Sequence, residues 1–289
     1  MTRARRPRRR RTTSHARRLG PPLHRRLRAR LPAPGRILAV LMMAGLVAGL
    51  AVLVNGPWLR VGQVAWAGQR YTPGYQLERI LGRLRGAQLL TVDNAALAAD
   101  LDALPAVAGV RVEALLPDRL WVTLVEQKAV FIWRTSAVQL VCAANGTAIG
   151  QIALRSDLPK DLAVLPRIDD RRVDSRNIIV GDTLDTATVA TALRLAAMQP
   201  AALGSSATGV TVQLDDEYGF VLIAQGASWE AAFGRYASDA SGVQGSGSPG
   251  SADQILAQVA AVRTLFSLQP EGSVSWVDAR NPGKVYWRP

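Results

Sequence analysis

A single apolar run constrains this chain more than any other feature of its sequence. Residues 37–54 consist of Ile, Leu, Val, Met, Ala and Gly, with no charged or hydrogen-bonding side chain. At 1.5 Å per residue, a helix of this length is about 27 Å long, close to the hydrocarbon thickness of a bilayer. We therefore predict a transmembrane helix over residues 37–57.

The positive charge of the chain lies in front of this run. Residues 1–36 contain fourteen Arg and no acidic residue, and removing these from the 35 Lys and Arg leaves 21, against 22 Asp and Glu. The positive-inside rule places the N-terminus in the cytoplasm and everything after residue 55 outside it. We interpret residues 1–36 as a basic, disordered cytoplasmic tail that sets topology and rests on anionic lipids. Nucleic-acid binding is disfavoured, because no aromatic side chain precedes Trp58 to stack on bases.

Two other interpretations of the apolar run are weaker. A cleavable signal peptide needs a small-residue cleavage site close behind the run, but the only good A-x-A sequence, residues 65–67, lies beyond Pro57 and Trp58. A buried core helix of a soluble protein would leave the Arg-rich segment in front of it unexplained.

Residues 61–128 are predicted to form a compact α+β domain. A short strand at residues 61–67 precedes Thr72 and Pro73, which suit the N-cap and the first position of a helix. Asp93 is predicted to cap a second helix. Two stretches with period 2, 110–113 and 120–125, then flank a turn, so the predicted order is β-α-α-β-β. The two predicted helices would bury these apolar residues: Leu77, Ile80, Leu81 and Leu84, then Leu97, Leu101 and Leu104.

Residues 129–289 are predicted to form a second domain with a mostly antiparallel β-sheet and helices. Residues 238–251 are rich in Ser and Gly and read as a surface loop. The predicted helices are residues 186–198 and 253–266, and the predicted strands are residues 130–133, 138–142, 210–214, 220–224, 274–280 and 284–288.

Several segments resemble one known family. Residues 104–112 read LPAVAGVRV, residues 116–122 read LPDRLWV and residues 125–127 read VEQ. These resemble a POTRA domain and, more narrowly, the bacterial cell-division family FtsQ, called DivIB in Gram-positive bacteria. Residues 277–280, VDAR, are similar to the family's VDLR ending, with Ala279 in the usual Leu position. The family usually has an Asp before the turn at residues 144–146, where this chain has Ala144 and Asn145.

This resemblance implies a single-pass, non-enzymatic scaffold of the inner membrane at the division septum. Its implied partners are the membrane proteins FtsB and FtsL, together with FtsK and other division proteins. We expect a partner segment to pair with the last strand of the sheet. Because a strand alternates faces, at least one of Tyr286 and Trp287 is expected in the core. The competing interpretation is that Trp276, Val285 and Trp287 simply fill the core. The residues predicted to bind a partner are Arg280, Asn281, Lys284, Val285, Tyr286 and Trp287.

No catalytic, metal or cofactor site is predicted, and no nucleic-acid or small-molecule ligand. Both His residues lie in the tail, and Cys142 lies in an apolar run without a His partner, as a buried, inert thiol would. The glycines of residues 245–250 follow no strand and open no helix, so a nucleotide loop is disfavoured. Residues 215–217 read as a solvated turn and residues 169–172 as a surface charge cluster.

Two alternative functions follow from the same observations. The first is a POTRA protein of secretion or outer-membrane assembly, for which several POTRA repeats or a long C-terminal barrel would be expected. The second is an exported cell-wall hydrolase or a regulator of one.

Overall fold

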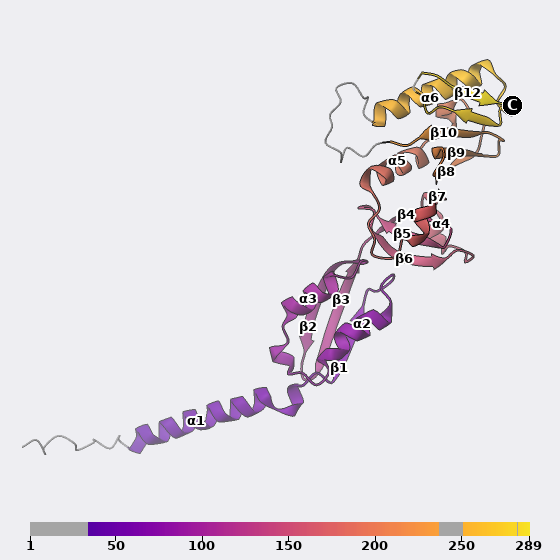
Figure 1. Ribbon diagram of the computed structural model, residues 1–289. Helices are drawn as coiled ribbons and strands as arrows, with labels where there is room; N and C mark the ends of the chain where they lie inside the picture. Colours follow the sequence, from indigo (N-terminus) through magenta and orange to yellow (C-terminus); the bar gives the residue numbers. More distant parts are fainter. Residues whose placement is uncertain (1–33, 237–250, 282) are drawn as a thin grey trace, which may run out of the picture. The chain divides into compact units, whose positions relative to one another are not determined.

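The computed structural model describes residues 34–236, 251–281 and 283–289, and the chain divides into two units, residues 1–53 and 54–289 (Figure 1). The predicted basic tail up to residue 33, the predicted Ser/Gly-rich loop up to residue 250, and Pro282 lie outside the described residues.

The predicted membrane helix is present as α1 (Pro34–Asn55). Residues 35–55 form a helix long and apolar enough to cross a bilayer, and none of it is buried inside the protein. Large apolar side chains are exposed along its length, among them Leu46 at 74% and Met42 at 70%. Such exposure is costly in water and favourable in lipid. The helix is therefore compatible with a single-pass membrane protein.

The segment after α1 folds in the predicted β-α-α-β-β order, and we call this segment the first domain. A three-stranded sheet has the order β1-β3-β2, with β1 parallel and β2 antiparallel to the central β3. The side chains of Leu77, Leu101 and Val122 are fully buried between sheet and helices. The Asp93 carboxylate accepts bonds of 3.0 Å from the backbone N–H groups of Ala95 and Ala96, as predicted for an N-cap. The elements are β1 (Gln63–Ala67), α2 (Gly74–Leu81), α3 (Asn94–Asp102), β2 (Val107–Leu115) and β3 (Arg119–Glu126).

A carboxylate from the end of β3 holds the connection between β1 and α2. Glu126 accepts the backbone N–H groups of Arg70, Tyr71 and Thr72 at 2.8, 2.8 and 2.9 Å. Here the sequence-based prediction was wrong by one residue: the N-cap of α2 is Pro73, not Thr72. Pro73 has the extended backbone of an N-cap and its carbonyl oxygen accepts the Gln76 amide, whereas the Thr72 hydroxyl makes no hydrogen bond among the described residues and so does not cap the helix.

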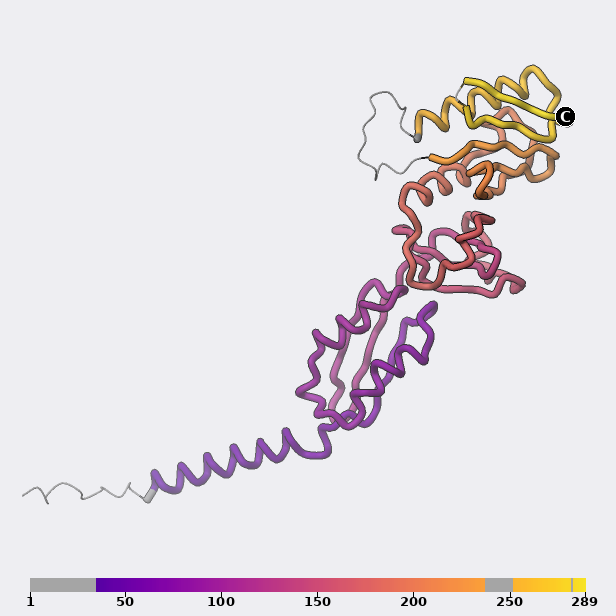
Figure 2. The backbone as a smooth tube through the Cα atoms, in the orientation of Figure 1, coloured from indigo at the N-terminus to yellow at the C-terminus, as the bar shows by residue number. Residues whose placement is uncertain are grey.

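In its described residues, the second domain contains a nine-stranded sheet in the order β12-β11-β10-β9-β8-β7-β4-β5-β6. Figure 2 shows the C-terminal segment, in yellow, running along the end of this sheet. The strands are β4 (Ala129–Arg134), β5 (Val138–Ala143), β6 (Ala148–Ala153), β7 (Arg167–Asp170), β8 (Gly209–Asp215), β9 (Gly219–Gln225), β10 (Glu230–Gly234), β11 (Trp276–Asp278) and β12 (Tyr286–Arg288). The helices are α4 (Lys160–Ala163), α5 (Thr186–Ala196) and α6 (Ser251–Leu268).

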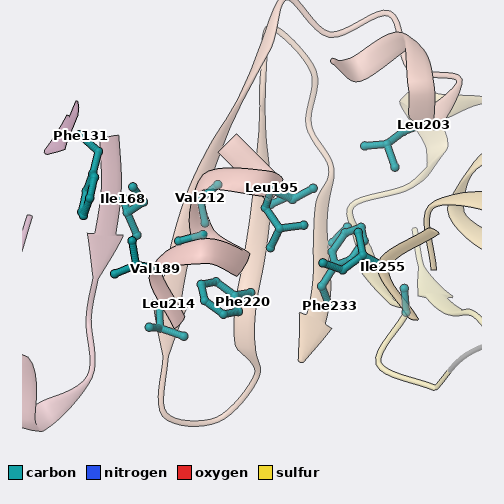
Figure 3. Close-up of a cluster of buried hydrophobic side chains, with 14 of the residues drawn as sticks. Phe131, Ile168, Val189, Leu195, Leu203, Val212, Leu214, Phe220, Phe233 and Ile255 are labelled. Atoms are coloured by element: carbon teal, nitrogen blue, oxygen red, sulfur yellow. The ribbon is translucent and has the colours of Figure 1, made fainter. Parts of the chain in front are cut away.

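Helices α5 and α6 bury the main core of this domain against the sheet. In Figure 3, Val189 and Leu195 of α5 point toward Val212, Leu214 and Phe220 of β8 and β9. Within α5, Ala192 and Leu195 are fully buried, whereas Leu193 and Ala196 are only partly buried. A second cluster, with Ile132, Val141 and Leu162, lies on the other face of β4 and β5.

The sheet is mixed and mostly antiparallel, as predicted. The described strands form five antiparallel pairs and three parallel ones, β4–β7, β7–β8 and β10–β11. Helices α5 and α6 lie between the strands of two parallel pairs, as crossover connections require. Strands β6, β7 and β10 are not among the predicted strands.

The predicted surface charge cluster at residues 169–172 is wrong in one respect. Asp170 is only 1% exposed, because it belongs to β7 and faces the core. Its carboxylate accepts bonds from Trp133 Nε1 at 3.0 Å and from Arg172 at 3.0 and 2.7 Å. A buried carboxylate is tolerated here because each oxygen has a donor.

Replacing Glu126 with Gln is expected to destabilise the protein by about 1–3 kcal/mol, because a neutral amide offers one acceptor oxygen and turns its NH2 toward backbone donors. The measurement is chemical unfolding of the full chain in detergent micelles. Glu113→Gln, on the exposed side of β2, serves as the matched control and should leave the free energy of unfolding nearly unchanged. Equal effects of the two variants would contradict the role given to Glu126.

Candidate partner-binding edge

The predicted docking strand forms one edge of the large sheet. Strand β12 lies at one end of the sheet and, among the described strands, pairs only with β11. In the register of β11 and β12, Trp276 lies opposite Arg288, Val277 opposite Trp287 and Asp278 opposite Tyr286. The outer side of β12 therefore presents backbone donors and acceptors that another extended segment could use.

The strand beneath this edge is fixed from the core side. Val277 of β11 is fully buried in the cluster that contains Ile255 and Val262 of α6. The buried side chain of Gln258 donates to the carbonyl oxygen of Phe233 at 2.8 Å and accepts the Tyr236 hydroxyl at 2.5 Å. Helix α6 is thus bonded to the end of β10 as well as packed on it.

A carboxylate anchors the turn that leads from α6 into β11. Glu271 accepts bonds from Trp229 Nε1 at 2.6 Å, from the Ser206 amide at 2.9 Å, from the Ser206 hydroxyl at 2.7 Å and from the Ser205 hydroxyl. Partial burial acts to raise the pKa of Glu271, but these hydrogen bonds outweigh it and lower the pKa to about 2. The charged form of Glu271 therefore fixes the start of β11.

The face of β11 and β12 that carries Trp276 holds a stack of aromatic and cationic groups. The rings of Tyr218 and Trp276 meet edge-on with centroids 4.8 Å apart. The Arg280 guanidinium lies 5.2 Å from the Tyr218 ring centroid, and that of Arg288 lies 5.7 Å from the Trp276 centroid. Such contacts hold long side chains in place on an exposed surface.

The two aromatic residues of β12 do not follow the prediction that at least one is core. Tyr286 is 60% exposed and Trp287 is 39% exposed. They do point to opposite faces, because Trp287 pairs with buried Val277 and Tyr286 with Asp278. Neither is buried because β12 is only three residues long and no described strand lies beyond it. Val285, just before the strand, packs partly against the core.

The other predicted residues surround this strand. Arg280 donates to Asp278 through Nε at 2.9 Å and Nη2 at 2.6 Å, and these bonds hold the pKa of Asp278 below its usual range. Asn281 and Lys284 are exposed, and the Lys284 amide donates to the Asn281 carbonyl oxygen at 3.1 Å. Arg280 is therefore already paired within the chain, whereas no ion pair involving Lys284 is present among the described residues.

Two features on which catalysis often depends, a metal-ligand cluster and a reactive thiol, can be checked in the described residues. In residues 34–236, 251–281 and 283–289, no group of three or more His, Cys, Asp and Glu side chains is arranged to hold a metal ion. Cys142 is fully buried, and its burial raises the pKa of the thiol to about 12. This thiol is therefore protonated and inert at neutral pH, as predicted.

The comparison with protein families decides the nature of the first domain. Residues 59–127 match the family model of the POTRA domain of the FtsQ type. These residues form an FtsQ-type POTRA domain. The match covers the first domain, is consistent with the FtsQ/DivIB family, and supports a division-related POTRA protein. A search of curated proteins finds no match.

Sequence reasoning missed two parts of the edge. Strand β10, between β9 and β11, carries Ala231 and Ala232, and these small residues give a weak strand signal. Glu271 gave no signal either, because its partners Ser205 and Trp229 are 66 and 42 residues away in the chain. A buried Trp with one polar ring atom does indicate that some acceptor must exist.

Lowering the pH is expected to weaken the anchor of β11. Because the folded-state pKa of Glu271 is depressed from 4.5 to about 2, its stabilising effect is present above pH 4.5 and is lost as the pH falls toward 2. Glu271→Gln should therefore melt at a lower temperature than the parent chain at pH 7. Near pH 2 the difference between the two melting temperatures should be smaller.

The control for this experiment is Asp157→Asn in an exposed loop, which should change the melting temperature little at either pH. A constant difference between Glu271→Gln and the parent chain from pH 7 to pH 2 would contradict the proposed role of the charge.

Proposed function

We propose that this chain is a bitopic scaffold of the bacterial division machinery that recruits partners through strand addition at β12. The observation that carries the proposal is the exposed edge of β12, a strand that carries two exposed aromatic residues on opposite faces. The FtsQ-type POTRA domain supports a role in division. The exposed apolar helix α1 supports a single membrane span.

The edge has the properties that strand addition requires. Its backbone groups supply pairing that does not depend on sequence, while the side chains on the two faces select the partner. Tyr286 and Trp287 would pack on the two faces of an added strand as aromatic anchors. Lys284 would attract an acidic group of the partner, since Arg280 is engaged by Asp278.

The partners we propose are FtsB and FtsL, with FtsK and other division proteins as further contacts. The N-terminus would lie in the cytoplasm and both folded domains in the periplasm, because the Arg-rich residues precede α1. In this arrangement the chain links early cytoplasmic components to late periplasmic ones at the septum of the inner membrane.

Replacing Tyr286 with Glu is expected to weaken copurification of FtsB and FtsL with the full chain at least tenfold, because a charge would be buried in the interface. The melting temperature should change little, since Tyr286 is 60% exposed. Tyr75→Glu is the matched control, because Tyr75 is 64% exposed in the POTRA domain. Equal binding by the two variants, or equal loss of folding and binding in Tyr286→Glu, would count against the proposal.

The topology has its own test. An alkaline phosphatase fused after Trp58 should be active, because that enzyme folds productively only outside the cytoplasm. A green fluorescent protein exported at the same position should be dark. Removing half of the Arg residues before α1 should reduce phosphatase activity, whereas exchanging them for Lys should not. An inactive phosphatase fusion in the parent chain would overturn the proposed topology.

A further inference from the structure

Exposed apolar side chains gather where the chain enters the POTRA domain. Trp58 is 63% exposed, Leu90 is 53% exposed, and Leu115 and Leu116 at the β2–β3 turn are 46% and 68% exposed. We call these four residues the entry patch. Large exposed apolar groups in one region mark a contact with something less polar than water.

Backbone hydrogen bonds tie the segments of the entry patch to residues 60–63. The amides of Gly62 and Gln63 donate to the carbonyl oxygen of Asp118 at 2.8 and 3.2 Å, which fixes the β2–β3 turn. Val61 exchanges bonds of 2.8 Å with Gly86 and Ala87. Arg60 forms an antiparallel bridge with Gln88, two residues before Leu90. The entry patch is thus a fixed part of the domain rather than a set of independent loop tips.

Chain length restricts how far the entry patch can be from a membrane crossed by α1. That helix ends at Asn55, and Gly62 follows seven residues later. Seven residues span at most about 25 Å when fully extended. The 3-10 turn at Pro57–Leu59 shortens this reach, because its rise is only about 2.0 Å per residue.

The charges beside the entry patch suit a lipid surface. Arg60 and Arg119 are both exposed, and no ion pair involving either is present among the described residues. Arg119 lies opposite Gln63 in the β1–β3 register and directly follows the turn. Free guanidinium groups next to exposed Trp and Leu side chains are typical of segments at the membrane interface, where the cations meet lipid phosphates.

We propose that the entry patch lies in the headgroup region of the leaflet on the POTRA side, with Leu116 and Trp58 in contact with lipid. This inference rests on the proposed function, because it requires α1 to span the membrane. The contact gives the POTRA domain a second attachment to the bilayer besides its covalent link to α1.

The test uses the full chain in vesicles of phosphatidylethanolamine and phosphatidylglycerol in a 3:1 ratio. Leu116→Cys is labelled with a polarity-sensitive fluorophore, and quenching by lipids with a nitroxide near the headgroup is measured. Val164→Cys, at a position 80% exposed in the second domain, is the matched control, and Val47→Cys within α1 reports the membrane span. The native Cys142 is fully buried, so labelling of the parent chain should be negligible.

We expect quenching at position 116 to be at least twofold stronger than at position 164. Position 47 should be quenched by lipids that carry the nitroxide deeper in the acyl chain. Absence of quenching at position 47 would overturn the membrane span, and with it the proposed function. Quenching at position 47 with equal values at 116 and 164 would overturn the lipid contact alone. Protection of position 116 from aqueous iodide without lipid quenching would show that protein covers the entry patch, which also overturns it.

Discussion

The arrangement of the POTRA domain depends on the hydrogen bonds that the Glu126 carboxylate accepts. One carboxylate at the end of the central strand β3 accepts three consecutive amides, from Arg70 to Thr72, that would otherwise lack partners. It therefore fixes where the chain leaves β1 and where α2 begins. Nearby, a Cβ atom at Gly68, whose φ is +90°, would collide with the carbonyl oxygen of Leu124, so the close approach of this segment to β3 also requires glycine.

The second domain solves a related problem at its C-terminal edge. Strand β11 has only three residues, and two such short strands would not hold together in isolation. It is fixed instead by a buried Val277 beneath it, by the Glu271 anchor before it and by parallel pairing with β10. These contacts position β11, which in turn presents β12. The exposed edge can thus be both accessible and well ordered.

The sequence predicts the first domain better than the second for a physical reason. Leu77 and Leu81 fall on one helical stripe and Leu120, Val122 and Leu124 alternate cleanly, so each element of the POTRA domain is defined by its own local pattern. Strand β7 reads RIDD, and only the distant partner Trp133 and the nearby Arg172 make burial of Asp170 acceptable. The docking edge was predicted from its terminal aromatic strands, whereas the exposure of both Tyr286 and Trp287 depends on where the core ends. The extent of the core is set by tertiary contacts and not by the local sequence.

The parallel pairing of β10 with β11 has a consequence for synthesis. Glu230 lies beside Trp276, so the pair joins segments 46 residues apart with α6 between them in the chain, and β12 pairs with β11. A growing chain cannot display the β12 edge until residues 286–288 have emerged, when the rest of the domain is already available to fold. Because β12 pairs with β11, the proposed recruitment of a partner at β12 must follow synthesis of the segments that hold β11 in place.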